Sequence, residues 1–228
     1  MMDKAAIHAA EAFCKAGYPM DAESLLIVEL DGPNTEVDYL IDRVAEISKR
    51  CGAFSSRVSQ TEEERLSFWA GRKAAFPAVG RISPDYYCID GTIPRARLPE
   101  VLRKMTDMCD KHGLRVANVF HAGDGNLHPL LVFDSRIPGT LEKVQLAGEE
   151  IVKISLEAGG VLSGEHGIGL EKQRFMSQQF SQRDLEAQDA LRRSFDPENR
   201  SNPHKVLPTG SSCGEMSSLD EIPEGVWI

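Results

Sequence analysis

The sequence predicts an α+β fold: a split βαβ, or ferredoxin-like, antiparallel sheet with helices on one face, plus appended C-terminal helices. The first observation is the order of the segments, because short apolar runs alternate with longer amphipathic runs as β-α-β and then again as β-α-β. The second is an Asp-Gly pair between two apolar runs, which predicts an additional hairpin. We expect one domain over residues 1–208 and a loose Ser/Gly-rich tail over 209–228.

Amphipathic spacing and stop signals define the expected helices. They span residues 3–16, 35–50, 61–76, 99–112, 140–158, 170–178 and 182–194. Two boundaries carry explicit signals, since Asn34 can cap the second helix and Pro77 should end the third. Short apolar runs predict strands at 24–30, 53–58, 86–91, 115–121, 127–133 and 161–163. Residues 196–208 are rich in Pro and Asn and should be extended.

The composition narrows the function classes. The chain has 228 residues, enough to bury a core without staples, and a net charge of −9 with basic residues scattered singly. The lack of a polybasic run disfavours nucleic acid and anionic membrane surfaces as partners. No apolar run approaches the ~18 residues of a membrane span, and the N-terminus has no signal-peptide core. Five widely spaced cysteines are most simply reduced thiols, so we expect a cytoplasmic protein.

Two histidines flank the Asp-Gly pair and form the first candidate site. If Asp124 and Gly125 are the tip of a hairpin, cross-strand partners have numbers that sum to 249, as His121 and His128 do. The two residues would then lie opposite each other on one face, with Cβ atoms roughly 5 Å apart. Imidazoles held in this way can chelate one metal ion. The alternative is a pair of structural histidines whose hydrogen bonds are satisfied by the backbone.

A glycine-lined turn about forty residues later adds a carboxylate and a third imidazole. Glu165 would complete a ligand set of two His and one Glu, which leaves a position open for substrate. His166 would point the other way in an extended segment and could act as a general base near neutral pH. A surface-exposed glutamate and a helix-start histidine are the alternatives.

A basic residue beside an aromatic one is the candidate for substrate binding. Arg72 follows Trp69 by three residues on the third expected helix, and its guanidinium could hold a carboxylate in bidentate fashion. An ordinary solvated arginine is nearly as good an interpretation. The glycine clusters match neither GxGxxG after a strand nor GxxxxGK[ST], so cofactor-binding residues stay unassigned.

Four ordered motifs resemble those of one enzyme family. The stretch His121–Pro129 resembles the signature of the FAD-linked oxidases that have a vanillyl-alcohol-oxidase-type flavin domain. The stretches Gly159–Gly169 and Asn202–Pro208 look like two further signatures of their C-terminal domain, although His204 stands where members commonly have Gly. Phe68–Arg72 matches the Trp-x-x-Arg helix of that family. The similarity is closest to the glycolate oxidase and D-lactate dehydrogenase branches.

This resemblance implies oxidation of D-2-hydroxy acids to 2-oxo acids, with hydride passed to flavin. It implies that His121, His128 and Glu165 match the metal ligands of the family. It also implies that His166 matches the proposed base and Arg72 the arginine that binds the substrate carboxylate. The cofactors implied are FAD and a divalent metal, zinc or manganese by analogy with the family.

Family members carry a flavin-binding domain ahead of this region, and the similarity here begins near residue 20. We therefore expect the isolated chain to hold little FAD and to be inactive alone. Expected partners are a small 2-hydroxy acid, a separate flavin-binding domain or other oxidase subunits, and a second copy of the chain. One alternative is a non-catalytic binding or assembly module that keeps the scaffold without the chemistry. A weaker alternative is a metallohydrolase that uses the same ligands.

Overall fold

The computed structural model describes residues 1–208, which form an α+β fold with small antiparallel sheets, so the predicted class is confirmed. Contacts divide the chain into two compact units, one over Met1–Glu165 and one that begins at His166. Within the described residues the strands form three sheets of two, three and two strands, and a ferredoxin-like order is not seen. The predicted tail lies outside the described residues, and the single domain over 1–208 stays a prediction.

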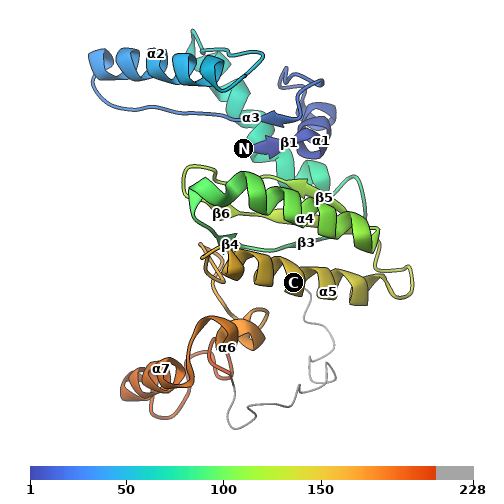
Figure 1. Cartoon of the computed structure of the whole chain (residues 1–228), viewed down its shortest axis with the longest axis vertical. Helices are drawn as coiled ribbons and strands as arrows, with labels where there is room; N and C mark the ends of the chain where they lie inside the picture. The colour runs from blue at the N-terminus through green and yellow to red at the C-terminus, as the bar shows by residue number, and fades with distance from the viewer. Residues whose placement is uncertain (209–228) are drawn as a thin grey trace. The chain divides into compact units, whose positions relative to one another are not determined.

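The first unit contains most of the regular structure (Figure 1). Its helices are α1 (Lys4–Cys14), α2 (Asn34–Arg50), α3 (Glu62–Val79), α4 (Leu98–His112) and α5 (Thr140–Glu157), with a 3-10 turn at Arg95–Arg97. Its strands are β1 (Met2–Asp3), β2 (Ser24–Leu25), β3 (Asp85–Cys88), β4 (Gly91–Thr92), β5 (Arg115–Asn118), β6 (Asn126–Leu127) and β7 (Pro129–Phe133). The long predicted helices are therefore confirmed to within a few residues.

Helix ends differ from the prediction at two places. Helix α2 begins at Asn34 itself, with Pro33 as N-cap and no side-chain cap, so the capping role of Asn34 was wrong. Helix α3 continues through Pro77 to Val79. The missing proline N–H removes only one helical bond, and the Gly80 amide still donates to the Phe76 carbonyl at 3.0 Å.

Several predicted strands are shorter than their apolar runs, because a strand needs a partner. The run 24–30 pairs only at Ser24–Leu25, and beyond it the side chain of Leu26 is 59% exposed. Residues 53–58 form no strand, and the segment 161–163 contributes a single bridge from Val161 to Thr92. Apolar runs in the sequence therefore predicted longer strands than the structure contains.

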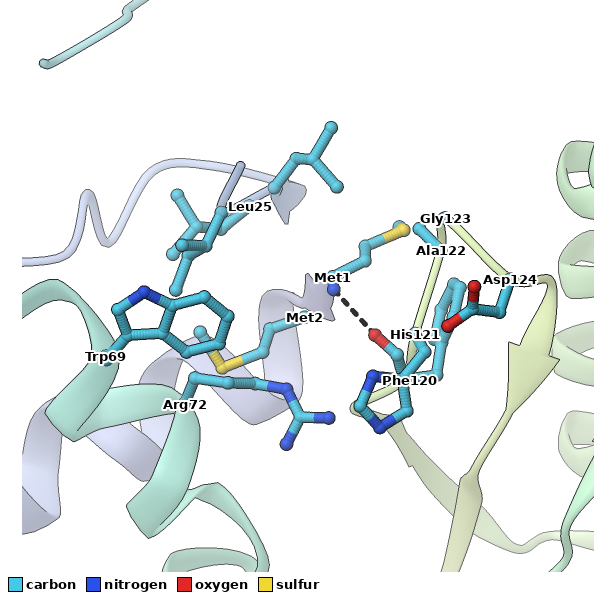
Figure 2. Close-up of a pocket in the computed structure, with 12 residues that line it drawn as sticks. Met1, Met2, Leu25, Trp69, Arg72, Phe120, His121, Ala122, Gly123 and Asp124 are labelled. Atoms are coloured by element: carbon cyan, nitrogen blue, oxygen red, sulfur yellow. Dashed lines mark hydrogen bonds between the residues drawn. The ribbon is translucent and has the colours of Figure 1, made fainter. Parts of the chain in front are cut away.

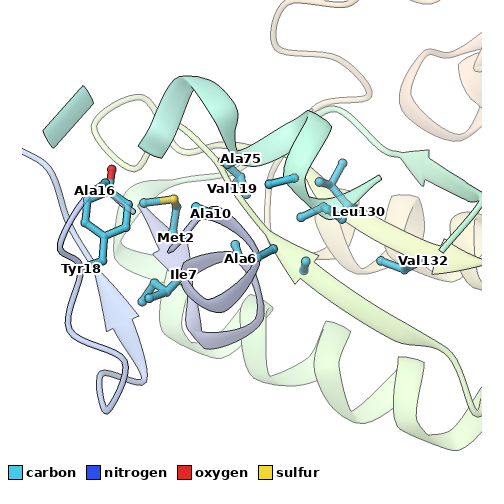
Figure 3. Packing of buried hydrophobic residues seen from close by; sticks show 14 of the residues in the cluster. Met2, Ala6, Ile7, Ala10, Ala16, Tyr18, Ala75, Val119, Leu130 and Val132 are labelled. Atoms are coloured by element: carbon cyan, nitrogen blue, oxygen red, sulfur yellow. The ribbon is translucent and has the colours of Figure 1, made fainter. Parts of the chain in front are cut away.

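The three-stranded sheet, in the order β3-β7-β5, supports the core of the first unit. Strand β7 lies in the centre, and Leu130 pairs with Cys88 on one side and Ala117 on the other. Figure 3 shows α1 packed over this region, with Ile7 and Val119 among the buried side chains. Helix α1 packs against both β5 and α3, so α3, which carries Arg72, is joined to the sheet through α1 and a shared core.

Strand β4 joins two segments that are distant in sequence. Gly91 pairs with Leu127 and Thr92 with Asn126, which ties β4 to the hairpin region. On its other side, Thr92 and Val161 exchange backbone hydrogen bonds of 3.2 and 2.8 Å. This short strand therefore fixes the segment before Glu165 against the segment before His128.

The second unit contains a 3-10 turn (Gln173–Phe175), α6 (Met176–Gln179) and α7 (Gln182–Phe195). The helix predicted over 170–178 is thus shorter and begins as a 3-10 turn, whereas α7 agrees with the prediction to one residue. Ser181 and Asp184 form a capping box at the start of α7. Among residues 1–208, no helix is long and apolar enough to cross a membrane.

Candidate metal and substrate site

The hairpin brings its two histidines together, although the predicted register was wrong by two residues. His121 bridges to Asn126, so partner numbers sum to 247, and His128 is not the direct partner of His121. The reason is a four-residue turn over 122–125, closed by Gly125 at φ 73°, in place of a two-residue tip. A shift of two residues keeps every side chain on its face. The two imidazole rings therefore still meet, with centroids 5.6 Å apart and planes at 82°.

Glu165 completes a cluster of three potential ligands within the first unit. Its Oε1 lies 2.7 Å from Nε2 of His128 and 3.8 Å from Nε2 of His121. One ligand atom from each residue lies within 4.8 Å of both others. His128 is 3% exposed, whereas His121 and Glu165 are each 50% exposed, so the cluster has a fixed inner side and an open outer side.

Helix α3 supports this cluster from one side. The Phe76 ring meets the His128 ring edge-on at 6.2 Å, which restrains the buried imidazole. One turn earlier on α3, burial lowers the pKa of Arg72, and the negative charge of Glu165 acts in the opposite direction. Arg72 therefore interacts electrostatically with the Glu165 carboxylate of the cluster.

A pocket of about 150 Å³ lies between α3 and the hairpin. Figure 2 shows Arg72 pointing from α3 toward His121, with Trp69 beside it. The remaining walls mix apolar and polar groups and come from the N-terminal segments and the hairpin: Met1, Met2, Leu25, Leu26, Ile27, Phe120, Ala122, Gly123 and Asp124. A guanidinium in a small pocket that has both polar and apolar walls suits a small carboxylic acid.

Tyr18, in the loop after α1, fixes the turn of α3 that carries Arg72. Its hydroxyl donates a hydrogen bond to the Phe68 carbonyl, and its ring lies against Gly71. A Cβ at Gly71 would lie 2.3 Å from Cε2 of that ring, so only glycine permits this approach. The contact therefore restrains the turn of α3 that carries Arg72.

The Tyr18 contact gives a testable dependence on pH. Burial raises the pKa of the Tyr18 phenol from 10.0 to about 12. Because the folded state holds the proton more tightly than the unfolded state, this stabilisation is present below pH 10 and is lost as the pH rises toward 12. We expect Tyr18→Phe to lower the free energy of unfolding at neutral pH by about 1 kcal/mol.

Between pH 10 and 12 the free energy of unfolding of the wild type should fall because of Tyr18, and the variant should not show this part of the fall. Denaturant unfolding at neutral and alkaline pH measures both effects. Tyr39→Phe is the matched control, because Tyr39 is 63% exposed on α2. Equal alkaline destabilisation in both variants would contradict the role of Tyr18.

Within the first unit the structure places His121, His128, Glu165 and Arg72 near one another, as the sequence predicted. His166 is exposed and opens the second unit, so its role as base stays a prediction. Sequence reasoning missed Asp90, which is fully buried and bonded to the segment that carries Glu165. The available signal was an acidic residue that ends an apolar strand directly before a glycine.

Comparison with known proteins places these residues in context. Residues 1–206 match the family model for FAD-linked oxidases, C-terminal domain. The chain is 50% identical over 219 residues to glycolate oxidase subunit GlcD of Escherichia coli K12, an alignment that covers 96% of this chain and 44% of the relative. It is 33% identical to the protein of the same name from Bacillus subtilis, covering 90% of this chain and 44% of that relative.

More distant similarity extends to a probable mitochondrial D-lactate dehydrogenase of Danio rerio, at 27% identity over 90% of this chain and 41% of that protein. Among solved structures, 4-ethylphenol oxidase from Gulosibacter chungangensis superposes with a TM-score of 0.53 at 15% identity, over 78% of this chain and 38% of that one. This structural match shows the fold alone. The chain spans less than half the length of these relatives.

Proposed function

Because this chain belongs to the family of FAD-linked oxidases, through their C-terminal domain, we propose that it is the substrate- and metal-binding part of a flavin-dependent D-2-hydroxyacid dehydrogenase. The observation that carries this proposal is the cluster of two imidazoles and one carboxylate beside Arg72. The names of the relatives favour glycolate or D-lactate as substrate and a 2-oxo acid as product.

The donor set fits a divalent cation. Two imidazoles and one carboxylate suit zinc or manganese, and three protein ligands leave positions for substrate oxygens. The short separations support this assignment, since His121, His128 and Glu165 need only small adjustments to share one ion. When bound, such an ion would polarise the 2-hydroxyl group of the substrate and lower its pKa.

The remaining roles fall to residues around the cluster. Arg72 binds the substrate carboxylate through its planar guanidinium, and the small volume of the pocket favours a short 2-hydroxy acid. His166 follows the ligand Glu165 directly in sequence and takes the hydroxyl proton. FAD is the hydride acceptor implied by the family, and we assign none of its contacts to this chain.

The chain covers less than half of its curated relatives, so we propose that turnover requires a flavin-binding part or other oxidase subunits. Alone, it should bind a cation and a small 2-hydroxy acid without oxidising it. A non-catalytic binding or assembly module is the competing proposal. Equilibrium dialysis against Zn²⁺ or Mn²⁺ separates the two, because a chain that binds neither cation supports the module and contradicts the dehydrogenase domain.

Substrate binding is tested at Arg72. Lysine keeps the charge but loses the two parallel N–H donors, so Arg72→Lys should weaken binding of glycolate or D-lactate to the cation-loaded chain by about 10-fold. Isothermal titration calorimetry measures this change. Lys73→Met is the control, because Lys73 is the next residue on α3 and is exposed. Unchanged affinity in Arg72→Lys together with a loss in Lys73→Met would reverse the assignment.

A further inference from the structure

We infer that Asp90 is the positioning residue of the metal site, which holds the Glu165 carboxylate in place by binding the backbone of the turn that carries it. This inference rests on the proposed function, since it concerns the ligand set described above. Asp90 itself is not among the residues whose ligand atoms cluster with His121 and His128. Its role is to determine where the third ligand lies.

The contacts of Asp90 converge on one short segment. The residue is fully buried between β3 and β4, and its Oδ2 accepts a hydrogen bond of 2.5 Å from the Ser163 hydroxyl. The Gly164 amide lies 3.0 and 3.1 Å from the two carboxylate oxygens. The amide of Glu165 itself donates to Oδ2 at 3.2 Å. Three consecutive residues are thus fixed by one side chain.

These bonds are strong for a physical reason. A carboxylate removed from water is costly unless donors replace its hydration, and bonds to an ionised acceptor are about twice as strong as neutral ones. If the turn of 163–165 moved away, the buried Asp90 side chain would lose three hydrogen-bond donors. The penalty for moving this turn is therefore much larger than for a turn held by neutral bonds.

Glycine at position 164 allows the turn to approach the hairpin closely. A Cβ at Gly164 would lie 2.3 Å from Oδ1 of Asn126 and 2.4 Å from Oγ1 of Thr92. Those two side chains belong to the paired strands β6 and β4, and Asn126 is also the bridge partner of His121. The Asp90 carboxylate binds the backbone of the turn, and the paired strands β4 and β6 limit how closely Gly164 can approach. Together these contacts set the position of the Glu165 backbone.

The Glu165 side chain is half exposed and lies 2.7 Å from Nε2 of His128. The position of its backbone therefore determines whether its carboxylate reaches His128. Groups that orient metal ligands in this way typically change metal affinity by about 10- to 100-fold when they are mutated. We therefore expect Asp90 to act on cation affinity and coordination geometry through Glu165.

Asp90→Asn is the direct test in the full chain. The asparagine side chain has the same shape as aspartate, but its NH2 group is a donor that would face the N–H donors of Gly164 and Glu165. The bonds to these two residues therefore cannot all form. Affinity for Zn²⁺, measured by isothermal titration calorimetry, should fall by about 10- to 100-fold. The visible absorption spectrum of the Co²⁺-loaded chain should change in band position or intensity, because the coordination geometry changes. Far-UV circular dichroism of the metal-free chain reports the fold.

Asp85→Asn is the matched control. Asp85 begins β3 and its Oδ2 accepts a bond of 2.9 Å from the backbone amide of Ser135, so it anchors a turn in the same way but away from the cluster. This variant should have the Zn²⁺ affinity and Co²⁺ spectrum of the wild type. A structural role alone would affect stability in both variants and leave the spectrum of each unchanged.

The outcomes separate the inference from the proposed function. Wild-type affinity and spectrum in a folded Asp90→Asn chain would overturn the inference and leave the metal site standing. A wild-type chain that binds no divalent cation would overturn both. If Asp90→Asn does not fold, Ser163→Ala decides, since it removes one donor and leaves the carboxylate. Zn²⁺ affinity reduced by about 3- to 10-fold would support positioning, and unchanged affinity would overturn it.

Discussion

Replacing Glu165 by glutamine is expected to lower the affinity of the chain for Zn²⁺ or Mn²⁺ by about 100-fold or more. Glutamine keeps the shape of the side chain but removes the negative charge and most of the donor strength. Because Glu165 is half exposed, the metal-free variant should unfold at nearly the temperature of the wild type. Equilibrium dialysis followed by elemental analysis measures the binding, and differential scanning calorimetry measures the stability.

Glu157→Gln is the control for this experiment, because Glu157 is an exposed glutamate at the end of α5 outside the cluster. Its cation affinity should equal that of the wild type. Equal affinity in both variants would mean that the carboxylate of Glu165 is not a ligand. The two imidazoles would then have to bind any cation without it.

Replacing Gly125 by alanine should cause the largest loss of stability among single changes near the site. Gly125 closes the hairpin turn at φ 73°, and an added Cβ would lie 2.1 Å from the carbonyl oxygen of Ile93. A backbone atom cannot move aside as a flexible side chain can. We expect a loss of about 3 kcal/mol or more in the free energy of unfolding, together with weaker cation binding.

Gly139→Ala separates the two causes of this loss. Gly139 has nearly the same backbone angle, φ 79°, but no atom lies within 4 Å of its added Cβ. It should lose only the cost of left-handed backbone, about 1–2 kcal/mol, and bind cations normally. Urea denaturation of both variants gives the comparison. A Gly125→Ala chain no less stable than Gly139→Ala would show that the carbonyl of Ile93 does not restrict the turn.

Local patterns predicted the helices and the convergence of the ligands for identifiable reasons. Helix α4 was predicted within one residue because its periodicity and its terminal glycine are both local signals. The meeting of His121 and His128 survived an error of two residues in register, since such a shift does not change the face. The four-residue turn brings Gly125 against the carbonyl of Ile93, a contact that no local pattern reveals.

Features that depend on distant partners were predicted with wrong bounds or missed. The short strands β2 and β4 are defined by pairing with residues elsewhere in the chain, and their own sequences gave no reliable bounds. Asp90 was missed because its partners are 73 to 75 residues away. The stretch up to Leu30 was predicted as strand from composition alone, although most of it has no neighbour with which to pair.

The bond between Asp90 and the turn of Glu165 also bears on the kinetics of folding. It closes a loop of 75 residues, and the bond from the Asn118 amide to Asp3 closes one of 115. Contacts so far apart along the chain carry a large entropic cost of closure, and proteins rich in them fold slowly. Assembly of the three ligands should therefore come late, after the helices have formed. A cation would then slow unfolding of the finished domain more than it would speed its folding.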